Sequence, residues 1–251
     1  QRQMCIRDSP KVLRFSHHRK NLAVIFQNEE DKGLFLKNRI IKEEQAFMIK
    51  GSGVDLNQYC YTPELESEKI KVLFTARMIV EKGVFVLVDA ALKLKEKYGD
   101  KVEFLLCGGL DDNPKAIKEE ELKAVCDGGY IQWLGYRTDV LELLKSCHIV
   151  AFPSYYKEGL PKSLIEAAAV GRPIVTTNSI GCKETVVDGY NGYLIPVKGS
   201  DTLAEKLNIL FEDENLRRNM GRNSRILAEK DFSIENVIHR HLEIYSQLSK
   251  A

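Results

Sequence analysis

From residue 72 onward, short apolar runs alternate with segments whose apolar residues recur at helical spacing. Buried strands are expected at Val72–Ala76, Val102–Cys107, Tyr130–Leu134, His148–Phe152, Pro173–Thr177 and Gly192–Ile195. Helices are expected over Gly83–Lys97, Pro114–Cys126, Thr138–Lys145, Pro161–Val170 and Lys183–Val187, and near 200–211 and 213–229. This alternation predicts an α/β fold: a Rossmann-like doubly wound parallel sheet with helices on both faces.

A shorter pattern of the same kind precedes it. Leu22–Gln27 and Ala46–Ile49 are typical of strands, with a helix over Glu29–Lys37 between them, and Ser233–Leu248 predicts a last helix. The sequence Gly-Ser-Gly at 51–53 and a polar stretch with one proline break the pattern, so a domain boundary is expected there. Residues 1–9, QRQMCIRDS, have no apolar core of a signal peptide and are interpreted as a non-native leader.

Composition narrows the function classes. The 37 basic and 36 acidic residues nearly cancel, which argues against a nucleic-acid partner. No run reaches the roughly 18 apolar residues that span a bilayer, so any membrane contact is expected to be peripheral. The six cysteines form no C-x-x-C pair, which argues against zinc, and Cys107 and Cys147 are expected to be buried thiols of a protein in a reducing compartment.

Two cations follow the first strand of the longer pattern. Arg77 and Lys82, with Gly83 behind them, occupy a turn from strand to helix. Ligands of such sheets bind at the carboxyl ends of the strands, and helix N-termini attract anions. Arg77 and Lys82 are therefore candidates for binding a diphosphate, and the alternative is that they are solvated surface cations.

Two carboxylates lie in the loop and helix after the strand at 148–152. Glu158 precedes Pro161, which presets a helical turn, and Glu166 lies inside the helix. Carboxylates accept hydrogen bonds from the hydroxyl groups of sugars and ribose, so both are candidates for the same crevice. The alternative is one glutamate favoured by the helix dipole and one that is solvated.

Together these stretches resemble the family 4 retaining glycosyltransferases. The matching pieces occur in the family's order: GSGVD, TARMIVEKGV, FLLCGG, IQWLGYRTDV and VAFPSYYKEGLPKSLIEAAAVGRPIVTTNSIGCKETVVDGYNGYLIPV. Ala76 departs from the glycine that the family commonly has. The stretch VIFQNEEDKGLFL resembles the end of the family's N-terminal domain.

The resemblance implies a GT-B fold of two Rossmann-like domains, of which this chain is an N-terminally truncated version. Residues 10–55 are then a remnant of the N-terminal, acceptor-side domain, and 56–69 are the linker. Residues 70–230 are the C-terminal domain that binds the nucleotide sugar, and 231–251 form a helix that packs back on the remnant.

The resemblance also assigns roles to single residues. Arg77 and Lys82 correspond to the pair that binds the donor diphosphate. Glu158 corresponds to the glutamate that faces the transferred sugar, and Glu166 to the one that holds the ribose hydroxyls. The remaining expected donor contacts are the backbone of Gly159 and Leu160 at the phosphates or sugar, and Tyr136 and Arg137 at the nucleobase.

The activity that the resemblance implies is that of a hexosyltransferase. A hexose or N-acetylhexosamine moves, with retained configuration, from a nucleoside-diphosphate sugar, expected to be UDP-linked, to a glycan or lipid-linked acceptor. No metal or cofactor is expected, and the carboxylates Asp111 and Asp112 are interpreted as loop residues. The expected location is the cytoplasm, including the inner face of the membrane, with peripheral association through the missing N-terminal domain.

Three alternatives differ in class. One is a sugar-nucleotide epimerase of the same fold, and another is a non-catalytic donor-binding fragment. A nicotinamide-binding domain is disfavoured because no G-x-G-x-x-G follows the first strand. The truncated chain is expected to bind donor but hardly to transfer sugar by itself, since a complete Rossmann-like half needs several βαβ units of ~30 residues.

Overall fold

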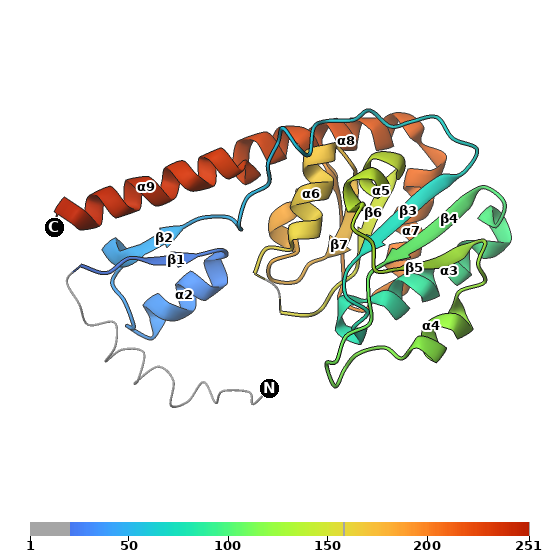
Figure 1. Cartoon of the computed structure of the whole chain (residues 1–251), viewed down its shortest axis with the longest axis horizontal. Coiled ribbons are helices and arrows are strands. Elements are labelled where there is room, and N and C mark those ends of the chain that lie inside the picture. Colours follow the sequence, from blue (N-terminus) through green and yellow to red (C-terminus); the bar gives the residue numbers. More distant parts are fainter. Residues whose placement is uncertain (1–20, 158, 251) are drawn as a thin grey trace.

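The computed structural model describes residues 21–157 and 159–250, and its main body is a six-stranded parallel sheet. The strands are β3 (Ile70–Thr75), β4 (Val102–Cys107), β5 (Ile131–Gly135), β6 (Ile149–Phe152), β7 (Ile174–Thr177) and β8 (Gly192–Ile195). Their spatial order is β5-β4-β3-β6-β7-β8, so the winding reverses between β3 and β6 (Figure 1). The doubly wound parallel sheet expected from the sequence is confirmed, and its switch point is the pair β3 and β6.

Helices cover both faces of this sheet because each strand is apolar on both sides. On one face α3 (Val84–Tyr98) packs against α7 (Ser200–Glu212). On the other face α6 (Lys162–Val170) packs against α5 (Val140–Ser146) and α8 (Glu214–Leu227). Every residue of α6 from Leu164 to Val170 is buried, which the run LIEAAAV permits because alanine allows close helix packing.

Two expected helices have different bounds. The helix expected over Pro114–Cys126 is α4 (Glu119–Val125), because the preceding residues form side-chain turns instead. Asn113 accepts from the backbone of Lys115, and Glu121 accepts from the backbone of Lys118 just before the helix begins. The helix expected near 183–187 is a single 3₁₀ turn, η3 (Lys183–Thr185).

A smaller unit lies beside the main sheet. It consists of β1 (Val24–Phe26), α2 (Glu29–Lys37), the 3₁₀ turn η1 (Glu43–Gln45) and β2 (Ala46–Met48), and its two strands are parallel to each other only. The last helix, α9 (Ile234–Lys250), covers this small sheet, with Val237 and Ile244 buried against Ile49 (Figure 1).

The chain crosses between the small unit and the main body twice, and the two crossing segments are hydrogen-bonded to each other. The backbone of Val54 accepts from Ile234 at 3.0 Å and donates to Phe232 at 2.8 Å. Phe232 ends a π-helical turn, η4 (Ala228–Phe232), that joins α8 to α9. The joint is therefore a short parallel ladder formed by two segments that lie far apart in the sequence.

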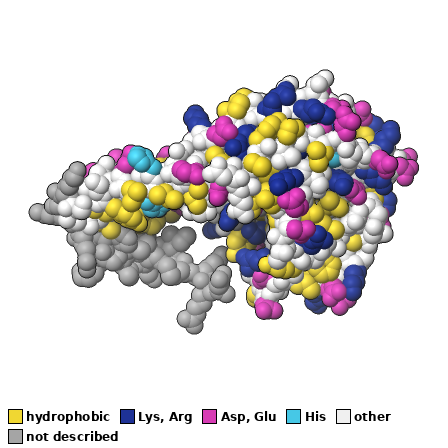
Figure 2. All heavy atoms as spheres, turned by 45° about the horizontal axis from the view of Figure 1, so that its top comes forward, with side chains coloured by type: hydrophobic (Ala, Val, Ile, Leu, Met, Phe, Trp, Pro, Cys, Tyr) yellow, Lys and Arg dark blue, Asp and Glu magenta, His cyan; other side chains and the backbone are white. Residues whose placement is uncertain are grey.

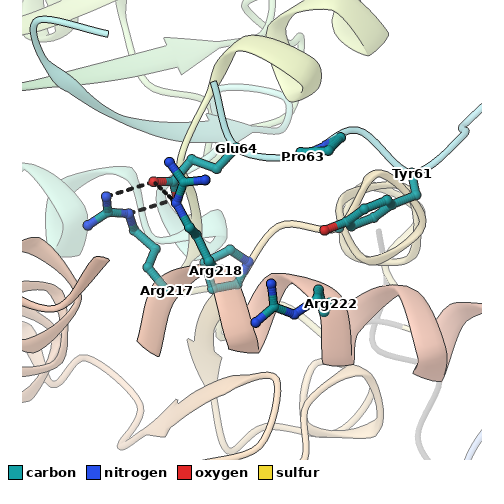
Figure 3. Close-up of a pocket in the computed structure, with 8 residues that line it drawn as sticks. Tyr61, Pro63, Glu64, Arg217, Arg218 and Arg222 are labelled. Atoms are coloured by element: carbon teal, nitrogen blue, oxygen red, sulfur yellow. Dashed lines mark hydrogen bonds and ion pairs between the residues drawn. The ribbon is translucent and has the colours of Figure 1, made fainter. Parts of the chain in front are cut away.

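Three arginines bind the segment between β2 and β3 to the main body through hydrogen bonds. Arg217 donates to both carboxylate oxygens of Glu64, at 2.8 and 2.7 Å, and both side chains are only 6% exposed (Figure 3). Arg172, fully buried, donates to the carbonyl of Thr62, and Arg225 donates to that of Tyr59. A buried, doubly hydrogen-bonded ion pair is costly to break once formed, so this segment has a fixed path.

Charges of both signs are interspersed on the face of the main body in Figure 2. This distribution gives no broad basic surface on that face of the kind that follows a nucleic-acid backbone. Within the described ranges, every helix is too short or too polar to cross a bilayer.

His148 generates a prediction about stability and pH. Its ring lies 4% exposed, where Nδ1 accepts from the backbone of Lys71 and Nε2 lies 3.2 Å from Ser67 Oγ. Burial lowers the pKa of His148 below its ordinary value. The unfolded chain therefore takes up this proton first, and stability that is complete above about pH 6.5 is lost as the pH falls through the folded-state pKa.

We expect His148→Asn to flatten this loss between about pH 7 and 5, measured as the free energy of unfolding in urea at each pH. The unchanged carboxylates provide the background slope in both proteins. Equal slopes for wild type and variant would contradict the assignment to His148.

Candidate functional site

The candidate site lies at the carboxyl ends of β3 and β6, where the winding of the sheet reverses. At this point the loops that leave adjacent strands run to opposite faces, which opens a crevice between them. The loop after β3 carries Arg77 and Lys82, and the loop after β6 leads to Pro161 and helix α6.

The two loops are bound to each other. The backbone amides of Tyr155 and Tyr156 both donate to the carbonyl of Glu81, at 2.9 and 3.0 Å. Gly83 has φ +89°, and a Cβ placed on it would lie 2.2 Å from the carbonyl oxygen of Pro153. Only glycine permits this approach, which brings the two loops together at the base of the crevice.

The two predicted phosphate-binding cations have different surroundings. Arg77 is about 60% exposed and forms an ion pair with Asp111 at 2.6 Å. Asp111, a residue interpreted from sequence as part of a polar loop, thus orients the guanidinium. Lys82 is half-buried, with its ammonium 4.8 Å from the ring centre of Tyr156 and 5.7 Å from that of Phe152.

A pocket with an empty volume of about 370 Å³ brings these cations together with the start of α6. Its lining consists of Thr75, Ala76, Arg77, Lys82, Phe152, Pro161, Lys162 and Ser163. Within the described part of the chain, no side chain caps the N-terminus of α6, and the first amide groups of a helix have no partner inside the helix. Cations and a helix N-terminus on one concave surface suit a ligand with several negative charges.

Thr75 adds an observation that sequence reasoning missed. Thr75 is 8% exposed, and its buried Oγ1 has no hydrogen-bond partner among the residues that the structure describes. An unsatisfied buried hydroxyl costs free energy, which a ligand atom in the pocket would recover. A threonine at the end of an otherwise apolar strand is the signal that could have identified it.

Glu166 lies one turn into α6 and is buried. Its carboxylate interacts with the hydroxyl of Tyr59 and lies 3.8 Å from Lys162 Nζ. Burial raises the pKa of Glu166, an effect that Tyr59 and Lys162 oppose, and burial beside Glu166 raises the pKa of Tyr59 to about 12. Glu166 does not line the pocket itself but contacts Lys162, which does.

The other predicted donor contacts lie apart from the pocket or outside the described residues. Glu158 is outside the described residues. The backbone amide of Leu160 donates to the side chain of Gln27, which belongs to the small unit and also lies against Gly159. Tyr136 is 78% exposed, and Arg137 is paired with Asp139, whose pKa it lowers.

Metal-ligating and thiol groups do not form a second centre. Residues 21–157 and 159–250 contain no cluster of three or more His, Cys, Asp or Glu side chains that could hold a metal ion. The predicted burial of Cys107 and Cys147 is confirmed, and both are free thiols.

Comparisons with known proteins show the family to which the chain belongs. Residues 62–226 match the family model of glycosyl transferases group 1. A Campylobacter jejuni protein, N,N'-diacetylbacillosaminyl-diphospho-undecaprenol alpha-1,3-N-acetylgalactosaminyltransferase, is 36% identical over 241 residues, which are 90% of this chain and 60% of that protein. The capsular polysaccharide biosynthesis glycosyltransferase CapM of Staphylococcus aureus is 27% identical over 180 residues, or 72% of this chain and 46% of CapM. The chain thus spans about half the length of these relatives.

Solved structures share the fold. A glycosyltransferase from Rickettsia africae superposes with a TM-score of 0.83 at 23% identity, covering 96% of this chain and 67% of the other. Anabaena Alr3699/HepE in complex with UDP-glucose superposes with a TM-score of 0.76 at 24% identity, covering 97% and 68%. The structural neighbours are GT-B glycosyltransferases, so the fold is of that kind.

The burial of Glu166 leads to a prediction about stability. Because its pKa is raised in the folded state, folding favours the protonated form, and the stability present at low pH is lost as the pH rises through the folded-state pKa. At pH 7.5 the ionised carboxylate therefore opposes folding. We expect Glu166→Gln, which keeps the shape without the charge, to have a Tm equal to or above that of wild type in calorimetry. A Tm lower by more than about 4 °C, or ~1 kcal/mol, would show that the charge stabilises the fold.

Proposed function

The chain belongs to the glycosyl transferases group 1 family, and we propose that it carries the donor-binding side of a retaining glycosyltransferase. The reaction would move a hexose or N-acetylhexosamine from a UDP-linked donor to a glycan or lipid-linked acceptor. The observation that carries the proposal is the pocket at the switch point, where Arg77, Lys82 and the N-terminus of α6 converge.

Charge is the physical reason that this pocket suits a nucleotide sugar. As the bond to the sugar breaks, negative charge grows on the leaving diphosphate, and fixed cations stabilise it without rearrangement. Asp111 holds Arg77 and aromatic rings hold Lys82, so both cations are preorganised. These groups supply the positive charge that a metal ion provides in other transferases, so we propose that no metal is required.

The two carboxylates are assigned to the two other parts of the donor, the ribose and the transferred sugar. We assign Glu166 to the ribose hydroxyls, since it lies one helical turn from the pocket and its oxygens are acceptors only. Glu158 is assigned to the transferred sugar by its match to the family motif, and its effect would be one of positioning. With these groups, departure and attack on the same face of the sugar need no protein nucleophile.

The proposed substrates follow what similar proteins are named for. The Campylobacter relative is named for transfer of N-acetylgalactosamine to a diphospho-undecaprenol-linked sugar, and HepE was solved with UDP-glucose. A lipid-linked acceptor would place the reaction at the inner face of the membrane. A thermal-shift screen against UDP, GDP and ADP and their sugars tests the donor, because a ligand that binds only the folded state raises the Tm. No shift with any of them would exclude the proposal.

Mutation of the two cations tests the diphosphate site. Lys82→Ala removes a half-buried charge, and we expect it to weaken UDP binding by about 2 kcal/mol in titration calorimetry. Arg77→Ala removes a more exposed charge, for which about 1 kcal/mol is expected. Arg240→Ala, an exposed and ion-paired arginine of α9, serves as the control. If both site variants bind as the control does, the site is misassigned.

The ribose assignment is tested with 2′-deoxy-UDP. Wild type should bind UDP more tightly than the deoxy form, and Glu166→Gln should reduce that preference because the amide binds hydroxyl groups more weakly than a carboxylate. Glu158→Gln should leave the affinity for free UDP unchanged and reduce turnover of the UDP-sugar. The opposite pattern would mean that the two roles are exchanged.

A further inference from the structure

A third cation, Lys162, lies on the wall of the pocket. It is the first residue of α6, its side chain is 68% exposed, and it lines the same pocket as Arg77 and Lys82. Its Nζ lies 3.8 Å from Glu166, at the outer limit of an ion pair. An ammonium group has three donors, and this long contact leaves the group able to bind a second anion.

Further hydrogen-bond donors lie near Lys162 in the lining of the pocket. Ser163 follows it on the uncapped first turn of α6, and the unpartnered hydroxyl of Thr75 lies in the same lining. Among residues 21–157 and 159–250, the lining contains three cations and no carboxylate. A ligand here must supply several acceptor oxygens and more than one negative charge, as a diphosphate does.

We propose that Lys162 binds the diphosphate of the donor as a third cation, from the side of the crevice opposite Arg77 and Lys82. The assignment rests on the proposed donor function of this pocket. Since Lys162 also neighbours Glu166, one side chain would join the diphosphate end of the site to the ribose end. The attraction of a cation grows with the negative charge of its ligand, so the loss of Lys162 should weaken a nucleoside diphosphate more than a nucleoside monophosphate.

The chain contains a matched control for an ordinary helix-surface lysine. Lys123 of α4 is 69% exposed and forms an ion pair with Glu119 one turn away, at 2.7 Å. Lys162 has the same exposure and the same spacing to Glu166, but its ion pair is longer and it lines the pocket. The two lysines therefore differ in the feature that the proposal uses.

The experiment is titration calorimetry of the whole chain with UDP and with UMP, at low and moderate salt. Lys162→Ala should weaken UDP about tenfold and UMP less than threefold. Lys162→Arg, which keeps the charge, should stay within about threefold of wild type for both ligands. Lys123→Ala should bind both as wild type does, and raising the salt should narrow the gap between Lys162→Ala and wild type.

Two outcomes would overturn the proposal. If Lys162→Ala binds UDP as Lys123→Ala does, Lys162 does not bind the ligand. If it weakens UDP and UMP equally, Lys162 acts on the ribose or on the shape of α6 and not through the charge of the diphosphate. Both leave the donor site intact when Lys82→Ala still weakens UDP, whereas loss of the Lys82 effect would reject the donor site itself.

Discussion

The contact between Gly83 and Pro153 is the constraint on which the crevice depends. At a switch point the loops after β3 and β6 run to opposite faces, and such loops would otherwise separate. The left-handed turn at Gly83 lets one backbone rest on the other, and the carbonyl of Glu81 then accepts two amides from the second loop. The positions of Lys82 and of the start of α6 both follow from this joining of the loops.

A second set of contacts lies at the amino end of β7, away from the crevice. There Gly171 and Pro173 precede β7 and line the same pocket as Arg217 and Glu64. Arg217 and Glu64 form an ion pair (Figure 3). Buried ion pairs contribute little net stability, because the cost of removing water offsets their attraction. Their effect here is geometric, since they set the path of the segment that carries Tyr59 to Glu166.

Much of the fold could be predicted from the sequence because its signals are local. Buried strands such as Ile149–Phe152 are continuous apolar runs, and α3 has apolar residues at helical spacing. The predicted start of α4 was wrong. Pro114 suggested a helix beginning there, but the side chain of Asn113 forms a turn with the backbone of Lys115 that competes with the helix.

The site was only partly predictable for the same physical reason. The loops that hold Arg77 and Lys82 could be found because parallel strands end at one edge. The partners of these residues could not, because Asp111 lies 34 positions from Arg77, and Tyr59 reaches Glu166 from another segment. The place of Lys162 in the pocket could not be predicted either, because it depends on the direction of the first turn of α6, which follows from the backbone at Pro161.

The double passage at Val54 and Ile234 has a mechanical consequence. Two backbone hydrogen bonds join Val54 to Phe232 and Ile234 in a short ladder, and ion pairs join Lys50 to Asp231 and Lys183 to Glu30, so the small unit is held at several points. Bending about that ladder would change the distance between Gln27 and Leu160, where the two units meet beside the crevice. The width of the opening beside the crevice is therefore coupled to the angle between the two units.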